Sequence, residues 1–386
     1  MEKTALLKCP KYDAEMVECK IREGFELLGG EDYIRNIIPV NSSVLLKPNL
    51  LISEKIGSPT LTHHVFFEGV VRVLKDYAGQ LSFGDSPGIG SGAKVAERCG
   101  IMDVARRYGV ECREFKKEVP YSLEKALRCR AWNVAADALN CDVLITLPKL
   151  KTHAMAFFTG AIKNQFGCIV GAQKAGWHTR MPNAHDFCRM LLDLNDVVKP
   201  SYAIMDGIVA MQGNGPKSGD PYELGAIIMG QSLSAVDSVA VQLIGYDDPL
   251  EIPALKEAHD HQWGTVLPED IEVLGEAISE MKVDDFEKAR AAGNFFFLGK
   301  RFNDLLTKFV APYPALIRSK CVSCGRCVEV CPENPKAVNM HPDKKQGSLP
   351  KWELDKCIRC FCCQELCPAG AIEIKQTFLG KLLKIK

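Results

Sequence analysis

The stretch CDVLITLPKLKTH, residues 141–153, passes from a continuous apolar run into a polar one. An apolar run of this length is typical of a strand buried on both faces, and Pro148, which has no backbone N–H, is expected to end it. Two comparable runs occur earlier, SVLLKPNLL (43–51) and QLSFGDSPG (80–88). Helical spacing of apolar residues separates such runs, for example in AHDFCRMLLDLNDVV (184–198). Continuous strands alternating with helices predict an α/β domain whose mostly parallel sheet has helices on both faces.

Polar side chains follow the expected ends of several of these strands. Ligands of parallel α/β sheets bind beyond the carboxyl ends of the strands, so we expect these side chains to converge. Each alone would ordinarily be a solvated charge or a turn residue, but the set suits an anionic small molecule. The candidate substrate-binding residues are Lys47, Asn49, Lys149, Lys151, Lys163 and Asn164.

The same strand ends offer candidates for proton transfer. His153 is the expected proton donor because the unperturbed pKa of histidine is near neutrality, and Asp85 or Asp206 would orient it. If the chain after Pro148 is an extended loop, Lys149, Lys151 and His153 alternate and share one face.

Nine of the 17 cysteines lie between residues 321 and 367, and they form a repeat. The spacing C-x2-C-x2-C-x3-C-P occurs in CVSCGRCVEVCP (321–332) and returns 36 residues later in CIRCFCCQELCP (357–368). Paired zinc knuckles also use four cysteines, but they need neither the third closely spaced cysteine nor the C-P. The spacing predicts two [4Fe–4S] clusters, each taking its fourth ligand from the other half. Cluster I would use Cys321, Cys324, Cys327 and Cys367, cluster II would use Cys357, Cys360, Cys363 and Cys331, and Cys362 would be surplus.

Charge and hydropathy exclude some classes of function. Lys+Arg and Asp+Glu both number 48, which argues against nucleic acid as a partner. The sequence has no run of 18 apolar residues, and its first apolar stretch is too short for a signal peptide, so we expect a cytoplasmic protein without a transmembrane segment. The expected divisions are an α/β domain (1–295), a linker (296–316), an α+β ferredoxin-like domain (317–375) and a basic amphipathic tail (376–386).

Several segments resemble known families. KPNL, GDSP, LPKLKTH, GAIKNQFG, MDGIVAMQGNGP and AVDSVAVQLIG are similar to the domain-of-unknown-function 362 family, and residues 317–375 resemble the bacterial-type two-cluster ferredoxins. The resemblance covers about residues 40–375 and implies an α/β domain, an anaerobic setting and redox work. Gln231-Ser232 stands where the family often has an aspartate, so this chain is expected to bind a different ligand if that aspartate contacts one.

Three functions are compatible with the sequence. The first is an iron–sulfur oxidoreductase that relays electrons between a partner protein and an anionic small molecule held in the α/β domain. The second is a non-catalytic electron-transfer or assembly subunit whose α/β domain docks a partner enzyme. The third is a lyase or isomerase in which the clusters only sense redox state. Strand-end lysines and His153 gathered in one cleft near a cluster would favour the first.

Overall fold

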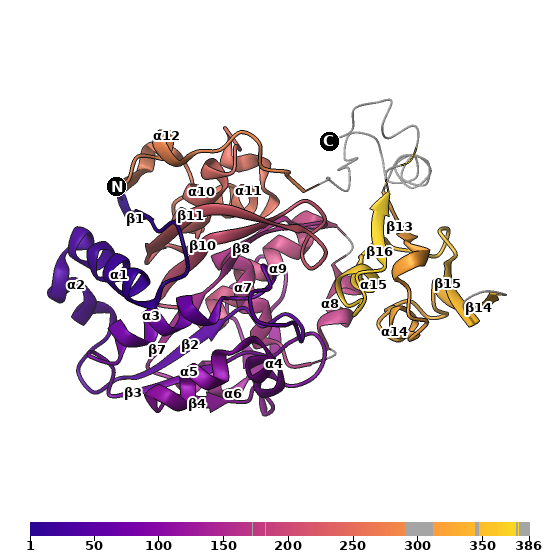
Figure 1. Cartoon of the computed structure of the whole chain (residues 1–386), viewed down its shortest axis with the longest axis horizontal. Helices are drawn as coiled ribbons and strands as arrows, with labels where there is room; N and C mark the ends of the chain where they lie inside the picture. The colour runs from indigo at the N-terminus through magenta and orange to yellow at the C-terminus, as the bar shows by residue number, and fades with distance from the viewer. Residues whose placement is uncertain (172, 182, 290–311, 344–346, 376, 378–386) are drawn as a thin grey trace.

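The computed structural model describes residues 1–386 except 172, 182, 290–311, 344–346, 376 and 378–386 (Figure 1). Most of the predicted linker and nearly all of the predicted tail lie outside the described residues. Among those described, no helix is long and apolar enough to cross a membrane.

One large sheet dominates the first domain. Its strands run in the order β12-β1-β11-β10-β7-β2-β3-β4, and β8 and β9 extend it beside β10. Five of the pairings along this path are parallel, and β11 is antiparallel to both β1 and β10. The predicted mostly parallel sheet is confirmed. The strands are β1 (Glu2–Lys8), β2 (Ser43–Pro48), β3 (Gln80–Gly84), β4 (Glu111–Arg113), β7 (Val143–Leu147), β8 (Lys149–His153), β9 (Phe157–Thr159), β10 (Tyr202–Gln212), β11 (Asp220–Gly230) and β12 (Ile271–Gly275), with a separate hairpin of β5 (Glu118–Ser122) and β6 (Ala131–Ala135).

Helices cover both faces of this sheet, as the sequence predicted (Figure 1). One hydrophobic cluster joins α1, α3, α4 and α5 to one face, and the other joins α9, α10 and α11 to the opposite face. The helices are α1 (Ala14–Leu28), α2 (Gly30–Ile37), α3 (His64–Leu74), α4 (Gly92–Cys99), α5 (Ile101–Tyr108), α6 (Ala136–Asn140), α7 (Ala161–Asn164), α8 (Gln173–Arg180), α9 (Ala184–Val198), α10 (Leu233–Leu243), α11 (Pro253–Asp260) and α12 (Ile278–Met281).

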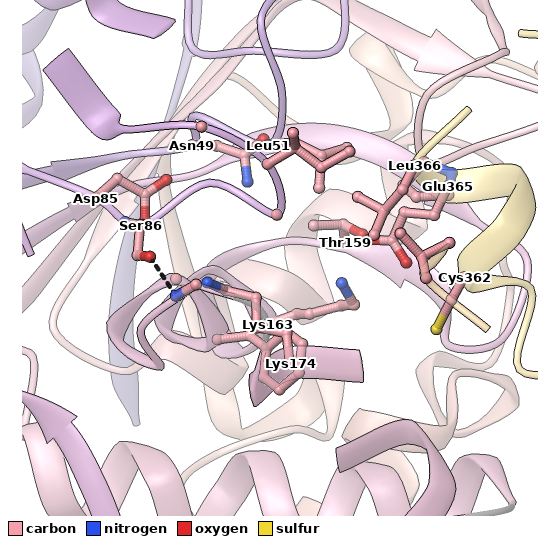
Figure 2. A pocket seen from close by; sticks show the side chains of 18 of the residues that line it. Asn49, Leu51, Asp85, Ser86, Thr159, Lys163, Lys174, Cys362, Glu365 and Leu366 are labelled. Atoms are coloured by element: carbon pink, nitrogen blue, oxygen red, sulfur yellow. Dashed lines mark hydrogen bonds between the residues drawn. The ribbon is translucent and has the colours of Figure 1, made fainter. Parts of the chain in front are cut away.

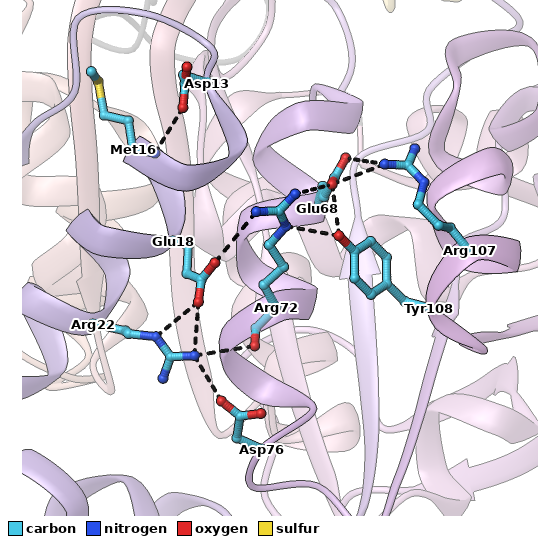
Figure 3. A network of polar contacts seen from close by, with 9 residues as sticks. All are labelled: Asp13, Met16, Glu18, Arg22, Glu68, Arg72, Asp76, Arg107 and Tyr108. Carbon is cyan, nitrogen blue, oxygen red and sulfur yellow. Dashed lines mark hydrogen bonds and ion pairs between the residues drawn. The ribbon is translucent and has the colours of Figure 1, made fainter.

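Ion pairs reinforce the packing of α1, α3 and α5 (Figure 3). The Glu68 carboxylate on α3 is nearly buried and accepts hydrogen bonds from Arg72 at 2.7 Å, Arg107 at 3.0 Å and the Tyr108 hydroxyl at 2.9 Å. Glu18 on α1 lies 3.7 Å from Arg72 on α3 and pairs with Arg22 at 3.0 Å. Burial alone would raise the pKa of Glu68, but the hydrogen bonds from Arg72 and Tyr108 and the charge of Arg107 lower it, so the carboxylate keeps its charge. This network therefore holds the helices together and does not serve a reaction.

The segment after Pro148 differs from the sequence prediction. Residues 149–153 form β8, which pairs with β10 and β9, instead of an extended loop. The pairing with β10 is irregular, because Lys149 lies opposite Asp206 whereas Lys151 lies opposite Met211. This break in register gives the two lysines different surroundings, although they are only two positions apart.

The second domain holds the cysteine repeat. It contains strand pairs β13 (Tyr313–Leu316) with β16 (Ile372–Lys375) and β14 (Val338–Asp343) with β15 (Gly347–Trp352), and two short helices, α14 (Arg326–Glu329) and α15 (Cys362–Glu365). Because β13 pairs with β16, the described part of this domain begins before residue 317.

Candidate functional site

A cavity of about 510 Å³ lies between the two domains (Figure 2). Its α/β wall comes from the carboxyl ends of β2 and β3 and from the segment around α7, as expected for a parallel sheet. Its other wall comes from α14, α15 and the residues that follow them. The polar side chains of the α/β wall include Asn49, Asp85, Lys151, Lys163, Asn164 and Lys174. The opposite wall includes Cys331, Cys362 and Glu365.

Direct contacts hold the domains against each other beside this cavity. The Lys217 ammonium group donates a hydrogen bond to the carbonyl oxygen of Cys367 and lies 3.5 Å from the Glu54 carboxylate. The Gln364 amide donates to the Asn214 carbonyl oxygen at 3.3 Å. A small apolar cluster of Ala154, Phe361 and Ile374 also crosses the boundary. The cavity is therefore enclosed by both domains.

Three lysines, which we call the cavity lysines, line it: Lys151, Lys163 and Lys174. The Lys151 Nζ donates to Asn49 Oδ1 at 2.7 Å and to the Thr60 carbonyl oxygen at 2.8 Å, and that of Lys174 donates to the Ile169 carbonyl oxygen. Lys163 is only 9% exposed, and no hydrogen bond or ion pair of its ammonium group occurs within the described residues.

Burial lowers the pKa of all three ammonium groups, that of Lys151 well below its usual 10.5 and that of Lys174 to about 8. No carboxylate forms an ion pair with them in the described part of the chain, and the charge of Glu365 on the opposite wall opposes the effect of burial only in part. Buried cations without a paired anion are unfavourable, and a bound anion would relieve the cost.

Asp85 lines the cavity but is already hydrogen-bonded. One carboxylate oxygen accepts from the Lys47 Nζ at 2.8 Å and from the Ser86 N–H at 3.0 Å, and the other accepts from the Leu50 N–H at 2.7 Å. Lys47 is fully buried and does not line the cavity. In this structure Lys47 fixes Asp85, and its predicted role in substrate binding stays a prediction.

Two asparagines predicted from the strand ends organise the same wall. The Asn164 amide donates to the Lys47 carbonyl oxygen at 2.9 Å and to Thr146 Oγ1 at 2.8 Å, and its oxygen accepts from Asn49 at 3.1 Å. Asn49 in turn accepts from Lys151. These amides fix the direction of the Lys151 side chain.

Besides Lys47, three further predicted site residues lie outside the cavity wall. Lys149 and Asp206 form a buried ion pair at 2.9 Å, and the Tyr12 hydroxyl bridges them, 2.6 Å from the lysine Nζ and 2.9 Å from Asp206 Oδ1. His153 is 2% exposed, and its Nδ1 accepts from the backbone N–H groups of Met155 and Ala156. The structure does not bring these three residues to the cavity wall, because β8 holds Lys149 and His153 and β10 holds Asp206 within the sheet. Proton donation by His153, its orientation by Asp206 and anion binding by Lys149 stay predictions.

Sequence reasoning missed four residues of this region: Lys174, Cys362 as a wall residue, Glu365 and Asp237. Lys174 and Glu365 follow no strand and reach the cavity only through the packing of α8 and α15. Asp237, within the quoted AVDS, accepts hydrogen bonds from the backbone N–H groups of Ala161 and Ile162 at the start of α7.

The cysteines fall into two neighbouring groups. The thiol of Cys327 has a pKa raised to about 11 by burial and, further, by the nearby thiols of Cys324, Cys367 and Cys321. Burial likewise raises the pKa of the Cys357 thiol, and the nearby thiols of Cys360 and Cys331 raise it further. Cys367 thus lies near the first half of the repeat and Cys331 near the second, as the predicted exchange of the fourth ligand requires, and the assignment of all eight ligands stays a prediction. Among the described residues, no group of three or more His, Cys, Asp or Glu side chains is arranged to hold a metal ion.

Cys362 belongs to neither predicted set of ligands but lies beside the second one. It is 2% exposed, hydrogen-bonds with Cys360 and forms part of the cavity wall. The surplus sulfur of the repeat therefore lies between a cluster-binding loop and the cavity.

An α/β domain joined to paired four-cysteine sets across a lysine-lined cavity defines an iron–sulfur protein of the electron-transfer class. Residues 44–242 match the family described as domain of unknown function (DUF362), and residues 320–371 match the 4Fe-4S dicluster domain. The chain belongs to the DUF362 family, and its carboxyl-terminal domain binds two [4Fe–4S] clusters, which implies electron transfer.

Individual proteins also resemble the chain. A thylakoid-associated protein of Synechocystis sp. is 32% identical over 259 residues, which cover 66% of this chain and 78% of that protein. A solved protein of Thermotoga maritima is 13% identical with a TM-score of 0.35, covering 53% of this chain and about half, 52%, of its own length. So low a TM-score adds nothing to the description of the fold.

Proposed function

We propose that this protein is an oxidoreductase that exchanges electrons between its two clusters and an anionic small molecule bound in the cavity between the domains. Cluster I takes Cys321, Cys324, Cys327 and Cys367, and cluster II takes Cys357, Cys360, Cys363 and Cys331. The observation that carries the proposal is that Cys331 and the cavity lysines line the same cavity. A small molecule bound there would contact Cys331, which is assigned to cluster II, and the three cavity lysines.

The residues of the wall have separate roles in this proposal. Lys163 and Lys174 bind the anionic group of the ligand, and Lys151, directed by Asn49, binds beside them. Phe166 and Leu366 supply apolar surface, so the ligand has an apolar part as well as its charge. Bound clusters supply single electrons, and their potentials depend on charge, hydrogen bonds and exposure. The cationic wall favours the more negatively charged state of the ligand and so assists its reduction.

The alternative is a non-catalytic electron-transfer or assembly subunit. Its supporting observation is that Lys149, His153 and Asp206, three of the predicted catalytic and binding residues, lie outside the cavity wall. Burying ammonium groups beside a cluster is unfavourable, however, and docking to a partner does not require it, so we favour the enzyme. The cytoplasmic and anaerobic setting stays a prediction, and the Synechocystis relative is named for an association with thylakoids.

Anaerobic purification followed by mass spectrometry of extracted ligands tests the proposal. The wild-type protein is expected to retain an organic anion that Lys163→Ala loses, while Lys125→Ala, a change of an exposed lysine outside the cavity, retains it. Adding the identified compound to reduced protein should then reoxidise the clusters, seen in their visible absorbance. Retention by Lys163→Ala as in wild type would remove the cavity as the binding site, and unchanged cluster absorbance would favour the non-catalytic subunit.

A further inference from the structure

The two clusters differ in their position relative to the cavity. Cys331, assigned to cluster II, lines it, and so does Cys362, which hydrogen-bonds with Cys360 of the same cluster. None of the four cysteines assigned to cluster I belongs to the cavity wall in the described structure. The residues assigned to cluster II would thus hold it next to the cavity, and cluster I would be the more distant one.

Cluster I is also the cluster nearer to solvent. Of the eight assigned ligands, Cys324 is the exposed one. It belongs to the segment Arg318–Gly325, which we call the cluster I loop. No atom lies within 4 Å of the place where a Cβ of residue 325 would stand, so the end of this loop faces open space. Because electron tunnelling falls off steeply with distance, a large partner exchanges electrons fastest at this loop.

The cluster I loop carries a basic and partly apolar surface. Val322 is 67% exposed, and it lies between Cys321 and Cys324 in sequence. Lys320 is exposed and has no ion pair among the described residues. Arg318 is 69% exposed and lies 3.0 Å from Asp343. The cluster I loop itself has these two basic residues and no acidic one, and Arg326, which follows it, pairs with Glu329 at 2.6 Å.

We propose that the cluster I loop is the docking surface for a one-electron carrier protein with an acidic surface around its redox centre. The inference rests on the cluster assignment of the proposed function, but not on the cavity ligand. Electron-transfer complexes are weak and have small interfaces, so one exposed apolar contact within a basic surface is sufficient. The basic residues attract the acidic partner and raise the association rate, and Val322 provides the apolar contact at the centre.

Binding and electron exchange with a small acidic ferredoxin test this inference. Calorimetry of the complete protein with its clusters gives the affinity, and stopped-flow absorbance gives the rate of cluster reduction. Lys320→Glu and Val322→Asp are each expected to lower affinity and rate by about tenfold at low salt, since charges at an interface act mainly on association. The rate with wild type should fall as salt is raised.

Two controls isolate docking from damage to the clusters. Lys3→Glu makes the same change of charge on β1, at the opposite end of the molecule from the cluster domain, and should behave as wild type (Figure 1). Photoreduced deazariboflavin, a small neutral donor, should reduce the clusters of all variants equally. Wild-type binding and rates in both loop variants would overturn the docking surface. Neither measurement needs a ligand in the cavity, so failure here is distinct from failure of the proposed function.

Discussion

The Asp237 carboxylate on α10 accepts a hydrogen bond of 2.5 Å from the backbone N–H of Ala161, the first residue of α7. Its second oxygen accepts from Ile162 at 3.0 Å. A side chain at Gly160 would place its Cβ only 2.1 Å from the same carboxylate, so glycine is required there. Because α7 carries Lys163 and Asn164, this contact between distant parts of the chain determines where one wall of the cavity stands.

Replacing Asp237 with alanine is therefore expected to weaken binding of the cavity ligand by about tenfold or more, because small displacements of binding groups are costly. The iron and sulfide contents should stay unchanged, since α7 does not belong to the cluster domain. Equilibrium dialysis with the co-purified anion gives the affinity. Asp237→Asn, which keeps one acceptor oxygen, should restore part of the affinity, and full affinity in the alanine variant would contradict a positioning role.

Because Lys149 and Asp206 form a buried ion pair outside the cavity wall, we expect replacement of Lys149 to lower the stability of the fold and not the affinity for the cavity ligand. Lys149→Ala leaves the Asp206 carboxylate buried without its cation, and the free energy of unfolding should fall by about 3–5 kcal/mol. Urea denaturation followed by circular dichroism of the anaerobic protein measures it. The double variant Lys149→Met, Asp206→Leu should lose less, because no buried charge is left unpaired. An equal loss in both variants would refute this explanation.

The cysteine repeat predicts different results for two adjacent residues. Cys362→Ser should keep both clusters, about eight irons and eight sulfides per chain, whereas Cys363→Ser should lose or convert one cluster. Iron and acid-labile sulfide assays with electron paramagnetic resonance distinguish the two. The prediction is wrong if the two phenotypes are exchanged.

The pKa of Lys174 predicts how ligand affinity depends on pH. Burial lowers this pKa to about 8, and a lysine is charged below its pKa, so anion binding is strong at neutral pH and is lost as pH rises through that value. Affinity for the co-purified anion should fall by about tenfold from pH 7 to pH 9 through this group alone. Lys174→Arg keeps its charge throughout and should show a shallower decline. Identical profiles in both proteins would exclude Lys174 from the site.

The sequence by itself determined the class of the fold and the cofactor. Continuous apolar strands between amphipathic helices allow little besides a mostly parallel sheet covered on both faces, because each strand has two faces to bury. The cysteine repeat likewise indicates its clusters from local spacing alone. Asn49, Asp85, Lys151, Lys163 and Asn164 were also found from the sequence, since strand ends of one sheet meet at one edge.

Only the tertiary structure decided which of the polar residues share a cavity. Lys149 and Lys151 are two positions apart, yet an irregular pairing of β8 with β10 places one beside Asp206 and the other in the cavity. Lys174 and Glu365 reach the cavity through the packing of distant elements, which no local pattern encodes. The position of the site between the domains likewise follows from packing, because the contacts that create it join residues about 150 positions apart.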